Sequence, residues 1–234
     1  MNNQHQAITF RVIVPLLFVI VIVIVSLLPL LISGRWNWLE GWIYALVNIL
    51  GFVMSRALAA RRHPDLLAER ARMMQHTDAT SWDKRLAPMV VVGGMLIAPV
   101  VGLDARFDWS PTFSSTVKII SLIIMLGGFA LGSYALIENR FFSGVVRIQT
   151  DRGHHVISSG PYRWVRHPGY AGAIMNYLAT PLFLDAVWAF VPAVLVTILL
   201  VIRTRLEDKT LQTELEGYHE YASRVRYRLL PRIW

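Results

Sequence analysis

The chain has 234 residues, of which 55% are hydrophobic and 16% charged, with a mean hydropathy of +0.47 and a formal net charge of +8. This composition is too apolar for a soluble protein of this length, and it indicates one membrane domain spanning residues 1–234. The sequence has no cysteine, which excludes disulfides, thiol nucleophiles and thiolate metal sites. A nucleic-acid partner is not expected, because no nucleic-acid-binding motif accompanies the positive charge.

The first half of the chain predicts four membrane-spanning helices arranged as two hairpins. Uncharged runs at Val12–Ile32, Leu86–Leu103 and Ile119–Ile137 approach the roughly 20 apolar residues that a helix needs to cross a bilayer. The run Gly41–Ser55 is shorter, but it reaches a similar length if Arg56 extends its charge to the membrane surface. Residues 1–138 therefore form a four-helix scaffold.

A polar segment, residues 61–85, separates the two hairpins. Pro64 is suited to the first turn of a short helix. An apolar side on this helix indicates that it lies on the membrane surface. That side consists of Leu66, Leu67, Ala71 and Met74.

The second half, residues 139–234, carries most of the polar chemistry around two further apolar runs. Tyr170–Leu184 and Ala186–Ile202 are separated by Asp185, and each contains a proline. Two short helices folded back as a hairpin fit this pattern better than one long helix. The predicted fold is all-α and polytopic, with five or six transmembrane helices, the last two a short hairpin, followed by a cytoplasmic C-terminal helix.

The distribution of basic residues predicts the orientation. If the N-terminus is cytoplasmic, only Arg35, Arg106 and Lys118 of the 23 Lys and Arg residues lie in the external loops. An excess of basic residues on the cytoplasmic side is the usual pattern for membrane proteins. The net charge therefore indicates contact with anionic membrane lipid.

The segment His154–Gly172 is rich in polar and aromatic residues, although apolar runs lie on both sides of it. Pro168 is placed to begin a helix, and the free N–H groups of a helix start favour an anion. The aromatic rings of Tyr162, Trp164 and Tyr170 are suited to stacking on a planar ligand. The alternative is an interfacial belt of aromatic and arginine side chains.

Arg203 and Glu207 follow the last apolar run and lie four residues apart, on one side of a helix. Such a pair is either an ordinary surface ion pair or a site for a zwitterionic ligand. No metal site is expected from the histidines, because His154, His155 and His167 have no fixed carboxylate partner and no thiol nearby.

The spacing of these residues closely resembles the core of the isoprenylcysteine carboxyl methyltransferase family of integral membrane enzymes. The resemblance covers about residues 138–234. An arginine and an acidic pair match Arg203, Glu207 and Asp208, although the family commonly has Glu at the position of Asp208. The remaining matching residues are His154, Val156, Ile157, Ser159, Gly160, Tyr162, Trp164, Arg166, His167, Pro168, Tyr170, Gly172, Leu211, Gly217, Tyr218, Tyr221, Arg224 and Pro231.

The resemblance implies methyl transfer from S-adenosylmethionine at the cytoplasmic membrane face. It implies that Arg203 and Arg166 are catalytic and that Glu207 pairs with the ammonium group of the cofactor. The implied cofactor-binding residues are Gln149, His154, His155, Val156, Ile157, Tyr162, Arg166, His167, Pro168, Gly169, Tyr170 and Glu207.

The acceptor is expected to be hydrophobic or lipid-like, with a carboxylate as the first choice, because a carboxylate needs little acid–base assistance and an arginine grips it in a bidentate manner. Phospholipid amines and small thiols are alternative acceptors. Two other readings remain open at this point. They are a nicotinamide-dependent membrane reductase, which would need a phosphate-binding cluster, and a non-catalytic relative. The sequence does not predict an oligomeric state.

Overall fold

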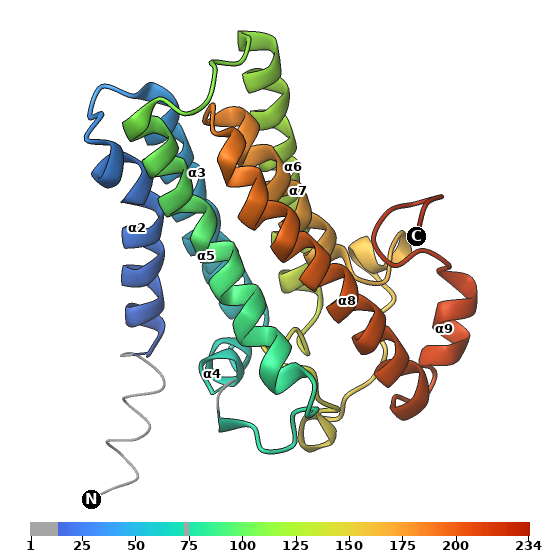
Figure 1. Cartoon of the computed structure of the whole chain (residues 1–234). Coiled ribbons are helices and arrows are strands. Elements are labelled where there is room, and N and C mark those ends of the chain that lie inside the picture. The colour runs from blue at the N-terminus through green and yellow to red at the C-terminus, as the bar shows by residue number, and fades with distance from the viewer. Residues whose placement is uncertain (1–13, 73–74) are drawn as a thin grey trace, which may run out of the picture.

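Five long helices stand side by side in the computed structural model, which describes residues 14–72 and 75–234 (Figure 1). Each is long and apolar enough to cross a membrane, and the described residues contain no strand. The predicted all-α polytopic fold is therefore confirmed. The five helices are α2 (Val14–Ser33), α3 (Leu39–Arg62), α5 (Asp83–Phe107), α6 (Ser115–Glu138) and α8 (Phe190–Glu214).

The predicted final hairpin is present, but only its first arm is short. Helix α7 (Pro168–Phe183) has 16 residues, whereas α8 has 25 and continues to Glu214. Pro192 does not interrupt α8, because it lies in the first turn, where backbone N–H groups have no partner within the helix. As a result, Arg203, Glu207 and Asp208 all lie on one continuous helix.

Helices α6 and α7 approach each other closely at two glycines. A Cβ atom added to Gly172 would lie 2.5 Å from the carbonyl oxygen of Gly128. Small residues allow this kind of close contact between membrane helices. The contact fixes the position of α7, and hence of the residues at its N-terminus.

The loops predicted to be external meet at one end of the bundle, at the top of Figure 1. Lys118 lies 2.8 Å from Glu40 and 2.6 Å from Asp185, and Arg35 lies 2.6 Å from Asp108. These ion pairs join the α2–α3, α5–α6 and α7–α8 connections. The side of the membrane that this end faces remains a prediction.

The short helix between the hairpins is α4 (Leu66–Ala71), which begins two residues after Pro64. Leu66 is fully buried against Ala59 of α3 and Leu136 of α6. The apolar side of this helix therefore packs on protein at Leu66, in contrast to the predicted membrane contact. Met74, the last residue of that predicted side, lies outside the described residues.

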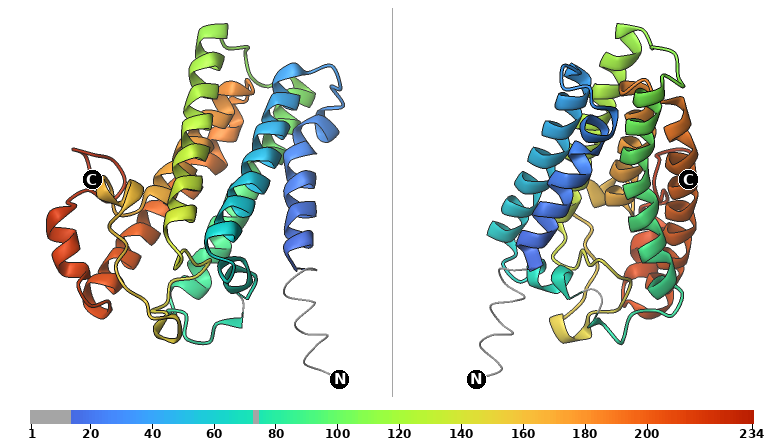
Figure 2. Two further views of the ribbon diagram at one scale, coloured as in Figure 1. Left: turned by 180° about the vertical axis from the view of Figure 1, so that it is seen from behind. Right: turned by 60° about the vertical axis from the view of Figure 1, so that its left-hand side comes forward.

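The predicted C-terminal helix is α9 (Tyr218–Arg224), which follows a turn at Gly217 with a φ of 76°. A positive φ favours glycine, which has no Cβ to clash. Beyond α9, the chain turns back toward the bundle, as both views of Figure 2 show.

Candidate active site

A pocket enclosing about 790 Å³, part of it open to solvent, lies among the loop 139–157, the 3-10 helix η4 (Gly160–Arg163), the start of α7, the second half of α8, and α9. Of the predicted site residues, only Pro168 does not line it. The lining residues that were predicted are Gln149, His154, His155, Val156, Ile157, Tyr162, Arg166, His167, Gly169, Tyr170, Arg203 and Glu207.

Other residues of the pocket wall were not predicted from the sequence. They share no polar motif, and most are apolar or aromatic side chains of the loop and of α8 and α9. Leu211, Tyr218 and Tyr221 belong to the family pattern but were not assigned to the site, and hydropathy assigns the other apolar residues to packing. The wall residues that were not predicted are Asn139, Phe141, Phe142, Ser143, Val145, Val146, Arg147, Leu211, Leu215, Tyr218 and Tyr221.

The backbone at the start of α7 differs from the predicted anion site. The amides of Arg166 and His167 donate to the carbonyls of Tyr227 and Arg228, both at 2.9 Å. The amide of Tyr170 donates to the carbonyl of His167 at 3.1 Å. Most N–H groups at this helix start are therefore already paired with protein oxygens.

Gly169 is needed for packing at the pocket wall. A Cβ atom at this position would lie 2.5 Å from the ring of Phe142. Because that distance is shorter than van der Waals contact, any larger residue would displace Phe142, which itself lines the pocket.

Arg166 is held by protein groups at all three of its nitrogens. Its Nε and Nη2 donate to the two carboxylate oxygens of Asp208, at 2.7 and 2.9 Å. Its Nη1 donates to the carbonyls of Val225 and Arg226. Burial opposes the charge, but the hydrogen bond and charge of Asp208 outweigh burial and raise the pKa of Arg166. These contacts suit Arg166 to positioning the pocket wall, and its predicted catalytic role stays a prediction.

Asp208, whose role the sequence left open, is the centre of a buried network. It is fully buried and also accepts hydrogen bonds from the Tyr218 hydroxyl at 3.1 Å and the Arg228 Nε at 2.9 Å. Gln212 donates to the same carboxylate. The network therefore joins α8, α9, the C-terminal segment and the start of α7.

Arg203 pairs with Asp83 of α5, 120 residues earlier in the chain, and not with Glu207. Its Nε and Nη2 lie 2.7 and 2.9 Å from the two oxygens of the fully buried Asp83. Within residues 14–72 and 75–234, its Nη1 has no hydrogen-bond partner, and this atom is not fully buried. The Nη1 edge of the Arg203 guanidinium therefore remains available to a ligand.

Glu207 faces the same pocket and accepts a hydrogen bond from the Tyr170 hydroxyl at 2.6 Å. That bond uses Oε2, and Oε1 has no partner among the described residues. The ring of Tyr170 stacks on His167, with ring centroids 5.8 Å apart, and lies 5.4 Å below the Cζ of Arg203. Tyr170 therefore contacts both the carboxylate of Glu207, through its hydroxyl, and the guanidinium of Arg203, through its ring, and lies between the two side chains.

His154 is uncharged at neutral pH. Burial is the main reason for the lowering of its pKa to about 4, and the neighbouring His155, Arg147 and Arg152 also lower it. Its Nδ1 accepts a hydrogen bond from the Gln149 amide at 3.2 Å. The buried side chain of Gln149 donates to the carbonyl of Phe141 at 2.8 Å, so Gln149 shapes the loop as well as lining the pocket.

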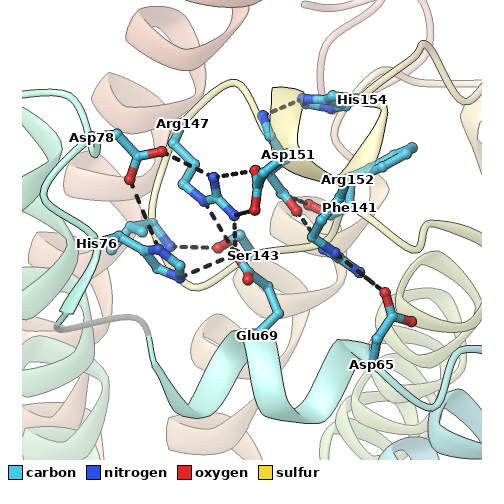
Figure 3. Close-up of polar contacts among 12 residues, drawn as sticks. Asp65, Glu69, His76, Asp78, Phe141, Ser143, Arg147, Asp151, Arg152 and His154 are labelled. Atoms are coloured by element: carbon cyan, nitrogen blue, oxygen red, sulfur yellow. Dashed lines mark hydrogen bonds and ion pairs between the residues drawn. The ribbon is translucent and has the colours of Figure 1, made fainter.

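Ion pairs attach the pocket loop to the first half of the chain (Figure 3). Arg147 is buried and lies 2.9 Å from Glu69 of α4, 2.9 Å from Asp78 and 2.8 Å from Asp151. Asp83 also accepts the amide of Val146 at 2.7 Å. The scaffold half of the chain therefore contributes directly to the pocket.

Comparison with known proteins agrees with this architecture. Residues 120–213 match the sequence model of the isoprenylcysteine carboxyl methyltransferase (ICMT) family. Over these residues the chain is similar to the ICMT family. The ICMT match covers most of α6, all of α7 and nearly all of α8. Asp83, the partner of Arg203, lies outside it.

Three relatives illustrate the range of the similarity. A probable protein-S-isoprenylcysteine O-methyltransferase of Oryza sativa subsp. indica is 31% identical over 85 residues, 32% of this chain and 44% of the relative. The lamin-B receptor of Drosophila melanogaster is 30% identical over 101 residues, 42% of this chain and 14% of the receptor. A delta(14)-sterol reductase of Mus musculus is 34% identical over 95 residues, 39% of this chain and 23% of the reductase. The chain thus spans less than half the length of each.

Proposed function

We propose that the protein is an integral membrane methyltransferase that uses S-adenosylmethionine and a hydrophobic, membrane-associated acceptor. One observation carries the proposal. The residues predicted to be catalytic or cofactor-binding are spread over positions 149–207, and all but Pro168 line one pocket. The proposal places that pocket at the cytoplasmic face of the membrane.

The polar groups of the pocket fit a cofactor that bears positive charge. When bound, S-adenosylmethionine supplies an electrophilic methyl group on a sulfonium. Glu207 has a free carboxylate oxygen for an ammonium group, and the ring of Tyr162 is suited to a neighbouring cation. His154 adds no repulsion, because its low pKa keeps it neutral.

Arg203 fits an acceptor carboxylate. Its unpaired Nη1 provides the hydrogen-bond donor, while Asp83 fixes the orientation of the guanidinium. Apolar side chains line the rest of this region, including Val145, Val146 and Leu211. The roles of these residues are to orient the acceptor and exclude water, and well-oriented reactants can gain up to ~7–11 kcal/mol from positioning.

The mouse relative makes a membrane reductase the second candidate. A nicotinamide cofactor carries phosphates, which need uncommitted cations. The arginines among the pocket-lining residues are Arg147, Arg166 and Arg203, and each is bound to at least one carboxylate. With respect to the described residues, Arg203 alone keeps a free nitrogen, Nη1, which is one donor for a single anionic group and not a cluster for several phosphates. This arrangement favours the methyltransferase.

The test is calorimetric titration of purified protein with S-adenosylmethionine and, in parallel, with NADPH. We expect binding of the first only. Glu207→Gln should weaken that binding by about 10-fold or more, since a charged hydrogen bond contributes ~1.5–3 kcal/mol. Glu214→Gln is the control, because Glu214 is exposed on the same helix. Binding of NADPH alone would instead support the reductase.

Acceptor use is tested separately with a labelled methyl group. Prenylated-cysteine carboxylates, phospholipid amines and thiols would be offered to the same preparation. Arg203→Lys keeps a cation beside Asp83 but loses the planar guanidinium. We expect this variant to bind S-adenosylmethionine normally and to lose turnover of a carboxylate acceptor. Equal loss of cofactor binding would contradict the role given to Arg203.

A further inference from the structure

The segment after α9 is fixed against the start of α7. Its carbonyls at Tyr227 and Arg228 accept the amides of Arg166 and His167, both at 2.9 Å. The Arg228 side chain binds Asp208 at 2.9 Å and lies 5.1 Å from the ring centroid of Trp234. These contacts give residues 225–234 a defined position.

That position is level with the membrane-spanning helices. In Figures 1 and 2, the C-terminus lies beside the middle of the bundle and not beyond the helix ends. The turn between α8 and α9 and the α4 region lie lower, at the end opposite the three ion-paired loops. The chain therefore leaves α8, turns through α9 and rises again alongside the bundle.

Large apolar side chains are exposed on this returning segment and on the adjacent η4. Trp164 is 59% exposed, Leu230 51% and Ile233 77%. We call these three residues the C-terminal patch. Exposed arginines accompany them, namely Arg163, Arg226 and Arg232. In the described part of the chain, none of these arginines forms an ion pair with a carboxylate.

The 3-10 helix η4, which precedes Trp164, packs against the end of α6. Tyr134, one turn from the end of α6, is 42% exposed. Gly160, the first residue of η4, packs against its ring, with its ideal Cβ position 3.1 Å from the Tyr134 Cζ. Because the outward face of α6 contacts lipid, the neighbouring patch lies at the same boundary.

We propose that the C-terminal patch is seated in the cytoplasmic leaflet and that its arginines bind anionic lipid headgroups. Apolar side chains at a bilayer boundary are stabilised by burial among acyl chains, and adjacent arginines extend to the phosphates. Negative lipid complements the three cations. The last ten residues thus form a lipid-anchored wall beside the pocket, joined to it through Arg228 and Asp208.

The absence of cysteine from the sequence allows a direct test with single-cysteine variants carrying a nitroxide. Ile233→Cys would be compared in lipid nanodiscs with Ile123→Cys, which is exposed on the spanning part of α6, and with Glu216→Cys in the exposed α8–α9 turn. The measurement is accessibility to oxygen relative to a water-soluble nickel chelate. We expect position 233 to resemble position 123, and resemblance to position 216 would overturn the proposal.

The charge requirement is tested in the same labelled protein. Arg163→Gln, Arg226→Gln and Arg232→Gln together should make position 233 more accessible to nickel in nanodiscs containing anionic lipid. The same substitutions should have little effect in purely zwitterionic nanodiscs. An equal change in both would overturn the role of anionic lipid. Dipolar broadening between labels at position 233 would show that a second copy of the chain covers the patch, which would also overturn the proposal.

Discussion

Asp208 is a single residue on which several elements depend. It is fully buried and binds Arg166 through two hydrogen bonds, while Tyr218 and Arg228 reach it from α9 and the C-terminal segment. A buried charge that loses its partner is strongly destabilising, because no water replaces the missing interaction. The stability of the protein therefore depends on this carboxylate more than on any surface ion pair.

We expect Asp208→Ala to lower the free energy of unfolding by about 3–5 kcal/mol, because it leaves Arg166 buried and unpaired. Thermal unfolding in detergent would measure the change. Asp78→Ala is a suitable control, because Asp78 is exposed and shares Arg147 with two other carboxylates. Asp78→Ala should lower the free energy of unfolding by less than about 1 kcal/mol. Similar losses in both variants would contradict the central role of Asp208.

His154 predicts a specific pH dependence of stability. Its pKa is about 4 in the folded protein, against 6.5 for an ordinary histidine. Between these values the unfolded chain binds a proton that the folded protein does not, so stability falls as the pH drops from about 6.5 toward 4. Unfolding midpoints measured at pH 7 and pH 5 should therefore differ more in the natural protein than in His154→Asn. An equal difference would show that other groups carry the dependence.

At the scale of elements, the close contact between α6 and α7 positions the site. The backbone of Gly172 meets that of Gly128 with no room for a Cβ atom. Separating the two helices would move the start of α7, where His167 and Tyr170 face the pocket. The glycines therefore affect the pocket without touching a ligand.

Gly172→Ala should destabilise the protein by about 1–3 kcal/mol, as is typical of an overpacked contact. Gly132→Ala is the matched control, because no atom lies within 4 Å of a Cβ at this position on the same interface helix. We expect Gly132→Ala to be neutral or slightly stabilising in thermal unfolding. A neutral effect of Gly172→Ala would mean that the two helices can separate without cost.

The helices themselves were largely predictable from the sequence. Uncharged runs such as Leu86–Leu103 and Ile119–Ile137 lie within α5 and α6, because only long apolar helices satisfy backbone hydrogen bonds in lipid. The length of α8 was underestimated, because hydropathy stops at the first charge, Arg203, whereas helical hydrogen bonding continues through Glu214. Hydropathy therefore predicts which residues of a helix lie in the membrane, but it does not predict the residue at which the helix ends.

The candidate site was only partly predictable. The sequence identified the polar residues of the motif, but it did not identify the residues with which they form ion pairs. Arg203 and Asp83 are 120 residues apart, and Arg147 and Glu69 are 78 apart, so no local spacing connects them. The helical spacing of Arg203 and Glu207 indicated a pair that does not form, because Asp83 competes for the arginine with better bidentate geometry.

At the scale of the whole molecule, the ion-paired loops and the pocket lie at different ends of the bundle. We predict that the pocket end is cytoplasmic. In sealed vesicles, Glu216→Cys should react with a membrane-impermeant maleimide added to the cytoplasmic side, and Thr112→Cys only from the opposite side. Both positions are exposed. Reaction of both residues from one side would contradict the proposed topology.

The Asp83–Arg203 pair has a consequence for how this protein could be divided or recombined. The segment that matches the ICMT family, residues 120–213, carries the arginine but not its buried carboxylate. If this segment were grafted onto another scaffold, Arg203 would lack its counter-charge. The pocket loop would also lose the hydrogen bond that the amide of Val146 donates to Asp83. Exchange between relatives should therefore succeed only where the donor and host both place an acid at the start of the third spanning helix, so that the two halves must change together.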